Sequence, residues 1–441
     1  MKEHHHNGGE AAVTERIPCK TEGCRATILP TTVAKTGGYC MPCHQEQERQ
    51  KRQAYIEQHR KTVNLYEDMT DPVEILKIMH APRQYDPLIQ YVPYPLGKEQ
   101  MYVSLTAEEA GRMLKYALEL LAAGDNSEAD EILLSLVCYR NDNITGALPE
   151  LMEQGMYHSG ILFKDAPPDI RDRLMQQVEW DEDNRNHLLL ILSWIGDPVV
   201  VSRFQEWRLH PPEWAGQLFV GPEIYAMEGG WELTPDGERR DLIHGLSYAI
   251  RVTDEQRDSS AEASAARFLK TSASICPWCE GKLTILMDVD TSHPSVAYLG
   301  LSLERLQMET CERCGCFGTI YMELDRQGVP VWSQFNRKPE YLPSFDSEDI
   351  SGVDVPRLTL SDEPHSPFYA ATWSLSQQDS QIGGHPSWVQ DADYPVCPCC
   401  AKRMRFIGQV DWADFDKFGE GIFYMFVCPE DKVTAALYQQ S

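Results

Sequence analysis

Residues 276–290 read CPWCEGKLTILMDVD, and residues 397–411 read CPCCAKRMRFIGQVD. The two stretches share a CxxC pair, the proline inside it, several apolar positions and the closing Val-Asp. A second pair follows each of them: Cys311-x2-Cys314 after the first, and Cys428-x2-Asp431 after the second. This self-similarity predicts an internal duplication of one β-rich, ribbon-like unit in which one cysteine has become aspartate.

Both units carry the spacing of a zinc site. Structural zinc takes four tetrahedral ligands, and a CxxC turn aims two thiolates at one ion. The spacing in the first stretch predicts a zinc ribbon with the ligands Cys276, Cys279, Cys311 and Cys314. The spacing in the second stretch predicts a mixed ligand set of Cys397, Cys400, Cys428 and Asp431, for which His385 and Cys399 are alternative fourth ligands. Carboxylates ligate zinc less commonly than thiolates, so occupancy of this mixed set stays open.

A third module lies nearer the N-terminus. Its pattern is Cys19-x4-Cys24, then fifteen residues, then Cys40-x2-Cys43. Gly37-Gly38 supplies the flexible backbone needed in a knuckle, the tight turn that presents a cysteine pair to a metal ion. A module this small requires metal to fold. The prediction is a zinc finger, with His44 as a possible substitute ligand. Two zinc ions are therefore expected in the chain, and a third is open.

Composition favours metal over disulfides. The chain has 441 residues and fourteen cysteines, of which all but Cys138 fall in the three clusters. The N-terminus, with His4, His5 and His6, lacks the pattern of a secretory signal. No run approaches the roughly 20 apolar residues of a membrane-spanning helix. We therefore expect a cytoplasmic chain with no membrane segment, in which clustered cysteines bind metal.

Charge is unevenly spread along the chain. Residues 1–64 hold 10 Lys/Arg against 7 Asp/Glu, leaving 30 against 60 in the remainder. Such a field repels phosphate backbones and favours a basic protein partner, although plain solubility is the other interpretation. Nucleic-acid binding is expected only through residues 16–61, the one basic segment, which carries Lys20, Arg25, Lys35, Arg49, Lys51, Arg52, Arg60 and Lys61.

The middle of the chain has helical apolar spacing from about Tyr66 to Ile250. Helices are predicted over 147–155, 168–178, 185–195, 199–208 and 239–250. The pair 186–195 and 198–207, joined by Gly196-Asp197, resembles a unit of HEAT-like helical repeats, and an irregular bundle is the alternative. A hairpin with Asp236-Gly237 at its turn is predicted within 229–237.

The predicted fold is therefore multidomain α+β: an N-terminal zinc finger, an all-α, helical-repeat-like middle, and a β-rich C-terminal part with duplicated zinc-ribbon units. The strands expected in the last part cover 283–287, 318–322 and 421–427, with a loop over 346–365. The predicted segments are a disordered leader (1–15), a zinc finger with linker helix (16–64), a helical domain (65–253), a linker (254–272) and the β-rich domain (273–441).

The C-terminal part resembles a known family. The sequences IGGHPSWVQ (382–390), YPVCPCC (394–400), MRFIGQVD (404–411) and YMFVC (424–428) are similar to those of the YwqG-like bacterial proteins. They are more distantly similar to the programmed-cell-death-2 family. The resemblance covers about 380–441, and 275–441 loosely. It implies binding rather than catalysis, as an immunity protein of a toxin system or a chaperone of a basic ribosomal protein.

Catalytic motifs are missing from the sequence. It contains no Gly-x-Ser-x-Gly elbow, Walker loop or GxGxxG, and the one His-x-Glu, at 44–46, lies far from the third cluster. We therefore expect a non-enzymatic zinc-binding module that neutralises or escorts a basic protein. One alternative is a zinc-finger regulator that contacts nucleic acid through 16–61. Another is a zinc hydrolase at the third cluster, with Glu430 as its base.

Overall fold

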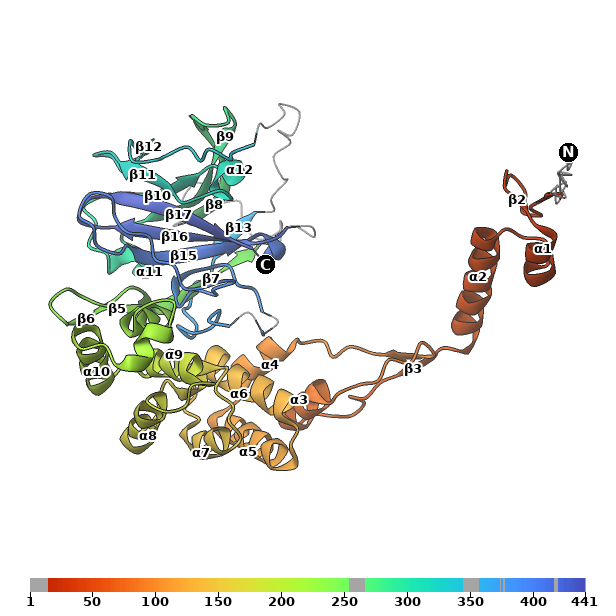
Figure 1. Cartoon of the computed structure of the whole chain (residues 1–441), viewed down its shortest axis with the longest axis horizontal. Helices are drawn as coiled ribbons and strands as arrows, with labels where there is room; N and C mark the ends of the chain where they lie inside the picture. Colours follow the sequence, from red (N-terminus) through yellow and green to blue (C-terminus); the bar gives the residue numbers. More distant parts are fainter. Residues whose placement is uncertain are drawn as a thin grey trace, which may run out of the picture. The chain divides into compact units, whose positions relative to one another are not determined.

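The computed structural model describes residues 15–253, 266–343, 357–372, 374–375, 377–415 and 419–440. The chain divides into two compact units (Figure 1). The first unit comprises residues 1–70 and 81–95, and the second comprises 71–80 and 96–441. The predicted leader, apart from residue 15, lies outside the described residues.

The first unit is built from short elements: β1 (Ile17–Pro18), β2 (Thr27–Ile28), α1 (Pro30–Thr36), α2 (Met41–His59), β3 (Lys61–Val63) and β4 (Ile89–Tyr91). The parallel pairing of β3 with β4 brings residues 81–95 back to this unit. Helix α2 runs for 19 residues and buries none of them, because charged and polar side chains surround it. It lies within residues 16–64, where a linker helix is predicted.

The second unit begins with a helical layer: α3 (Pro72–His80), α4 (Lys98–Ser104), α5 (Ala107–Ala123), α6 (Asn126–Arg140), η1 (Thr145–Ala147), α7 (Leu148–Glu153), η2 (Gly160–Phe163), α8 (Pro168–Val178), α9 (Arg185–Ile195), α10 (Pro198–Leu209), η3 (Glu213–Gln217) and η4 (Pro222–Gly229).

Local signals set several of these helix ends. Thr106 and Glu109 form a capping box at the start of α5, and Asp197 accepts hydrogen bonds from the first amides of α10. Helix α9 packs mainly against η4, α8 and η2. The HEAT-like relationship of α9 and α10 therefore remains a prediction.

The β-rich part follows the helices: β5 (Trp231–Leu233), β6 (Arg239–Asp241), β7 (His244–Val252), β8 (Ala266–Ile275), β9 (Lys282–Asp290), α11 (Pro294–Ala297), β10 (Arg305–Thr310), α12 (Glu312–Gly315), β11 (Ile320–Leu324), β12 (Pro330–Trp332), β13 (Leu358–Leu360), β14 (Gln381–Gly384), β15 (Arg405–Asp411), η6 (Trp412–Asp414), β16 (Ile422–Cys428) and β17 (Val433–Gln439).

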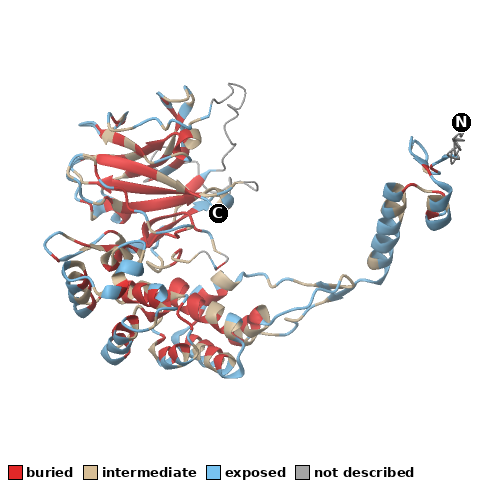
Figure 2. Cartoon of the chain, viewed as in Figure 1, coloured by how far each residue is buried: buried red, intermediate tan, exposed pale blue. Residues whose placement is uncertain are grey.

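Two sheets form the body of this part. Eight strands pair in the order β12-β11-β17-β16-β15-β14-β7-β13, and three more in the order β10-β9-β8. Both sheets supply side chains to one hydrophobic core, which includes Leu286 and Met308 from the small sheet and Ile407 and Met425 from the large one. Figure 2 shows the central strands of the large sheet almost wholly buried.

The helix predicted over 239–250 is wrong. This stretch forms β6, which closes the predicted hairpin with β5, and β7, which lies between β14 and β13 in the large sheet. Residues 247–250 are all buried, since β7 has neighbours on both sides. Its apolar spacing fits a helix, but ladder pairing with strands over a hundred residues away decides its conformation.

The predicted domain boundaries also change. The helical and β-rich parts form one compact unit rather than two domains, and β7 belongs to the large sheet. Residues 266–272 of the predicted linker lie in β8, whereas 254–265 lie outside the described residues. The predicted loop over 346–365 contains β13, and its residues up to 356 are likewise not described.

The fold class is thus confirmed in its coarse form, a mixture of helix and sheet around three cysteine clusters. Within the described ranges, no helix has both the length and the apolarity needed to cross a membrane.

Candidate metal centres

The first cluster lies in the first unit and brings together Cys19, Cys24, Cys40 and Cys43. The β1–β2 hairpin holds the first pair, and the amide of Cys19 donates to the carbonyl of Ala26 (2.9 Å). The second pair lies at the start of α2, where the Cys40 amide donates to Cys19 Sγ (3.2 Å). Gly37 and Gly38 have φ of 70° and 104°, so glycine is required for the chain to turn into this position.

The second cluster brings together Cys276, Cys279, Cys311 and Cys314. Its first pair lies in a tight knuckle between β8 and β9, where the Cys276 amide donates to the Gly281 carbonyl (2.8 Å). In the same knuckle, the Glu280 amide donates to the Cys276 carbonyl (2.9 Å), and Glu280 has φ of 61°. The second pair follows β10 on the short helix α12.

The third cluster brings together Cys397, Cys400, Cys428 and Asp431. Its knuckle repeats the second one: the Cys397 amide donates to the Lys402 carbonyl (2.8 Å), and the Ala401 amide to the Cys397 carbonyl (2.9 Å). Ala401 has φ of 59°, matching Glu280. The second pair begins at Cys428, the last residue of β16, so each knuckle precedes a strand whose antiparallel partner leads into the other two ligand positions.

The repeat extends to the strand pairing. In the repeat that begins at Cys276, Asp290 pairs with Arg305 and Met287 with Met308. At the corresponding positions of the repeat that begins at Cys397, Asp411 pairs with Ile422 and Gly408 with Met425.

A β-bulge falls at the same place in both units. It leaves Leu286 out of the β9–β10 register and the corresponding Ile407 out of the β15–β16 register. A third strand pairs in the same register in both repeats. Phe268 of β8 pairs with Met287 of β9, and at the corresponding position Ile382 of β14 pairs with Gly408 of β15. The strands β8-β9-β10 and β14-β15-β16 therefore repeat one pairing pattern, whereas their assignment as zinc ribbons stays a prediction.

The ligand atoms have the spacing of a tetrahedral metal. Within each cluster they all lie within 4.8 Å of one another. Zinc–sulfur bonds of about 2.3 Å place the sulfurs of a tetrahedron about 3.8 Å apart. The measured Sγ–Sγ distances are 3.8 Å for Cys24–Cys40, 3.5 Å for Cys279–Cys311 and 3.7 Å for Cys400–Cys428. All three donor sets therefore fit an ion such as zinc.

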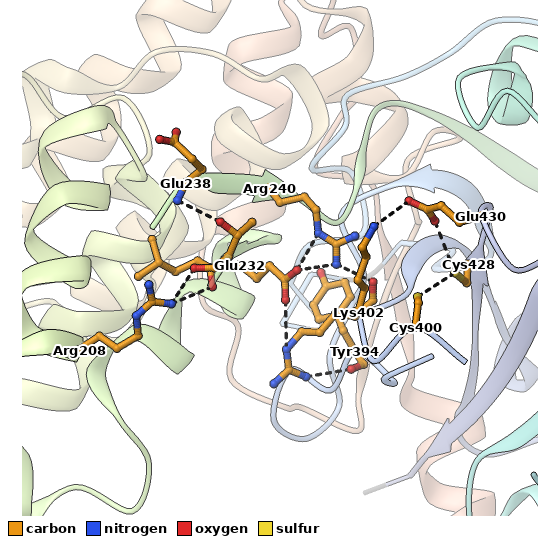
Figure 3. Close-up of polar contacts among 12 residues, drawn as sticks. Arg208, Glu232, Glu238, Arg240, Tyr394, Cys400, Lys402, Cys428 and Glu430 are labelled. Carbon is orange, nitrogen blue, oxygen red and sulfur yellow. Dashed lines mark hydrogen bonds and ion pairs between the residues drawn. The ribbon is translucent and has the colours of Figure 1, made fainter. Parts of the chain in front are cut away.

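The aspartate takes the fourth position of the third cluster. Asp431 Oδ2 lies 3.2 Å from Cys397 Sγ and 3.3 Å from Cys428 Sγ. Unlike the cysteines of this cluster, Asp431 is more than one-third exposed. Glu430 Oε2 lies 3.4 Å from Cys428 Sγ, and Glu430 also pairs with Lys402 Nζ at 3.6 Å (Figure 3). Two carboxylates therefore lie beside the thiols of this cluster.

Crowding of the thiols shifts their pKa values in opposite directions. The hydrogen bond from Cys311 lowers the pKa of Cys276 to about 5 and raises that of Cys311. In the first cluster, the backbone of Cys40 lowers the pKa of Cys19 to about 6. In the third cluster, burial raises the pKa of Cys428, and the thiol of Cys400 lowers that of Asp431. A bound cation would remove the repulsion that keeps the other thiols protonated.

The alternative ligands do not join the clusters. His44 and the exposed Cys399 lie outside the ligand sets. His385 is fully buried, and its ring nitrogens lie 2.9 Å from the Pro386 carbonyl oxygen and 2.7 Å from that of Glu228. His385 therefore joins the sheet to η4 instead of binding metal.

One contact network beside the third cluster was not predicted. The carboxylate of Glu232, in the β5–β6 hairpin, lies 3.6 Å from Arg403 and also pairs with Arg240. Arg240 donates to the Arg403 carbonyl at 2.7 Å, and Arg403 follows Lys402 in the third knuckle (Figure 3). These residues are 163 positions apart, and neither stretch carries a motif that indicates the contact.

Comparison with known proteins gives one relative. No family model matches the chain, and no solved structure matches it. A protein of Salmonella typhimurium (strain LT2), described as the uncharacterized protein YpfL, is 38% identical over 437 residues. The alignment covers 97% of this chain and the whole of the relative.

Proposed function

The chain belongs to the family of the Salmonella protein YpfL, and we propose that it is a cytoplasmic, non-enzymatic, zinc-binding protein that holds a basic protein partner. The observation that carries the proposal is the completeness of its ligand sets. Each cluster offers four donors, whereas catalytic zinc has three protein ligands and an open position for water or substrate. Zinc at these clusters would therefore stabilise structure.

Zinc is the metal that best suits these donors. Thiolates are soft ligands, and tetrahedral sets of four sulfurs are typical of zinc and of iron–sulfur sites. In the two repeated units, each ion would join a knuckle to the strand pair that follows it. Metal binding would thus contribute directly to the folding free energy of each ribbon-like unit.

The acidic excess of the second unit supports a basic protein as the partner. The first unit holds 11 Lys/Arg and 10 Asp/Glu, leaving 29 and 57 in the second unit. An excess of this size accelerates encounter with a basic protein and disfavours acidic partners. The sharpest form of the proposal is an immunity protein that neutralises a basic toxin, and a chaperone for a basic client is the other form.

Two rival functions remain as separate proposals. A nucleic-acid regulator would use the exposed helix α2, but Arg49 and Lys51 already pair with Glu46 and Glu48 there. A hydrolase would use the third cluster, where Asp431 is the exchangeable ligand and Glu430 the base. The pairing of Glu430 with Lys402 disfavours it as a base, because a neighbouring cation stabilises the carboxylate.

The test is affinity capture from lysate with the zinc-loaded chain, over a series of salt concentrations. We expect basic proteins that are released as salt rises. Neutral or acidic partners that resist salt would contradict the proposal. A gel shift that weakens steeply with salt would favour the nucleic-acid function, and turnover abolished by Glu430→Gln would favour the hydrolase.

A further inference from the structure

The third cluster differs from its repeat at two positions, and a cysteine is involved in both. Asp431 stands where the second cluster has Cys314, and Cys399 stands where the second knuckle has Trp278. Trp278 is half-buried, and its ring packs against that of Trp332 at 5.1 Å. Cys399 is exposed and lies outside the ligand set. The third knuckle thus has an exposed thiol in place of a packed tryptophan.

The knuckle places this thiol beside a ligand. In the second knuckle, the amide of Trp278 donates to Cys276 Sγ (3.4 Å), so the third residue of the turn lies against the first sulfur. The third knuckle has the same backbone hydrogen bonds, and its third residue is Cys399. The side chain of Cys399 interacts by hydrogen bonding with the thiol of Cys397. One turn therefore holds two neighbouring sulfurs, that of the buried Cys397 and that of the exposed Cys399.

Exposure alone does not distinguish Cys399. Cys316 is the other exposed cysteine of the chain, and it also lies two residues after a candidate ligand, Cys314. Its thiol donates to the carbonyl oxygen of Glu312 at 3.2 Å. The interaction with a ligand thiol is what marks Cys399 as a disulfide partner, because a disulfide requires two sulfurs that already lie close together.

We propose that Cys397 and Cys399 form a redox switch, in which a hydroperoxide oxidises the pair to a disulfide and the third cluster then releases its metal. The proposal rests on the zinc-binding part of the proposed function and adds its regulation. Loss of Cys397 would leave Cys400, Cys428 and Asp431, a set of three donors that includes one carboxylate. Such a set would hold zinc more weakly, since zinc binds thiolate more strongly than carboxylate.

The chemistry needs the two sulfurs and the oxidant. The exposed thiol of Cys399 attacks the O–O bond of the hydroperoxide, becomes a sulfenic acid and releases an alcohol, or water in the case of hydrogen peroxide. The thiolate of Cys397 then attacks the sulfenic sulfur. An S–S bond forms, the S–O bond breaks and hydroxide leaves. The two sulfurs together give two electrons, which reduce the O–O bond.

The surroundings of Cys399 make this switch slow. Desolvation and the charge of Asp431 raise the pKa of Cys399, which keeps its thiol protonated at neutral pH. The thiolate is the reactive form of cysteine, so a protonated thiol meets peroxide without reacting most of the time. We therefore expect a response to sustained oxidant, without the rapid peroxide turnover of an enzyme.

The third knuckle contacts the β5–β6 hairpin, which in turn contacts the helical layer (Figure 3). Arg403 lies 3.6 Å from Glu232 of the hairpin, and its carbonyl accepts from Arg240 at 2.7 Å. On the other side of the hairpin, Arg208 of α10 donates to the Leu233 carbonyl at 3.2 Å. Release of the metal would loosen the knuckle and, through these contacts, the hairpin. Oxidation should therefore increase hydrogen exchange in the hairpin.

The test uses the full, reduced, zinc-loaded chain and hydrogen peroxide. We expect release of one of three zinc ions, a Cys397–Cys399 disulfide in the peptide map, and recovery when dithiothreitol and zinc are added. Cys399→Ser should still bind three ions and should slow the release by about tenfold or more, since the oxidant then has to reach the ligands directly. The matched control Cys316→Ser removes the other exposed thiol and should release zinc as the wild type does.

Other outcomes contradict the proposal at separate points. Equal zinc release from Cys399→Ser would show that the ligands are oxidised directly. Release from the second cluster first, or a disulfide between other cysteines, would place the sensitive thiols elsewhere. Unchanged hydrogen exchange in the hairpin would contradict transmission to α10. Retention of all three ions by the oxidised wild type would exclude the switch and leave the proposed zinc binding intact. Two ions before any oxidation would instead contradict zinc at the third cluster, which is part of the proposed function.

Discussion

At the scale of single residues, Asp431 distinguishes the third cluster from its repeat. It occupies the position of Cys314, and its carboxylate interacts with all three thiols of the cluster. Zinc is borderline soft and binds thiolate more strongly than carboxylate, so Asp431 would be the weakest of the four ligands in a zinc site. The exposure of Asp431 also gives water and chelators access to that side of the cluster.

The first prediction compares the clusters by metal content. The wild-type chain should bind three zinc ions, and Cys397→Ser should bind two. A chelator should remove the ion at the third cluster before the other two, and Asp431→Cys should slow the loss of that ion by about tenfold or more. Elemental analysis and a colorimetric zinc-release assay measure both effects. Two ions in wild type and in Cys397→Ser alike would contradict zinc at the third cluster.

The second prediction concerns three carboxyls around Ser380. Burial raises the pKa of Asp414 to about 6, and it raises the pKa values of Asp379 and Asp411 as well. Because the folded pKa of Asp414 exceeds the usual value of about 3.9, its contribution to stability is full below pH 4 and is lost as pH rises past 6.

Asp414→Asn should therefore stabilise the chain at pH 7, by on the order of 1 to 2 kcal/mol, and change little at pH 4. The amide keeps an oxygen that can accept the Ser380 hydrogen bond, which spans 2.8 Å. Urea unfolding at both pH values measures the difference, and the exposed Asp183→Asn serves as control. Destabilisation at pH 7 would show that the charged form of Asp414 is the favoured one.

At the scale of elements, the repeated strand pairs face each other across one core. Leu286 and Ile407 occupy the same bulge in β9 and β15, and Met308 and Met425 the same position in β10 and β16. All four are buried in the core that the two sheets share. Two copies of one unit thus bury the same face against each other, as two subunits of a symmetric dimer do.

The third prediction follows from this equivalence. Leu286→Ala and Ile407→Ala should each cost about 2 to 5 kcal/mol of unfolding free energy, since each leaves a cavity in the shared core. Ile275→Ala, at a residue of β8 that is 60% exposed, should cost much less. Urea denaturation midpoints make the comparison. A large loss at one bulge and none at the other would contradict the equivalence of the two positions.

At the scale of the whole molecule, we expect the two units to depend on metal to different degrees. The hydrophobic cluster of the first unit has Cys19, Ile28 and Cys40 as its buried members, so two of the three are candidate metal ligands. The second unit has in addition the large core between its sheets and the helical layer. Below roughly 40 residues, domains generally need a metal or disulfide to fold.

The fourth prediction is selective unfolding by chelation. Removal of zinc should abolish protection against hydrogen exchange over residues 17–43, while the helices and central strands of the second unit stay protected. Cys19→Ser should reproduce the effect in the presence of zinc. Hydrogen exchange measured by mass spectrometry separates the two units. Persistent protection of residues 17–43 after chelation would show that this unit folds without metal.

The sequence alone sufficed to predict the three groups of candidate metal ligands, the two repeated stretches and four of the five helices named from it. Knuckles, caps and hairpin turns are local, so CxxC spacing and cap residues such as Thr106 and Asp197 suffice to place them. Only the tertiary structure decided that 239–250 is strand, because β7 owes its conformation to β14 and β13. It alone also placed Glu232 against Arg403 and joined the helical and β-rich parts in one unit. Contacts between residues far apart in the chain leave no periodicity in the sequence, which is why such decisions required the fold.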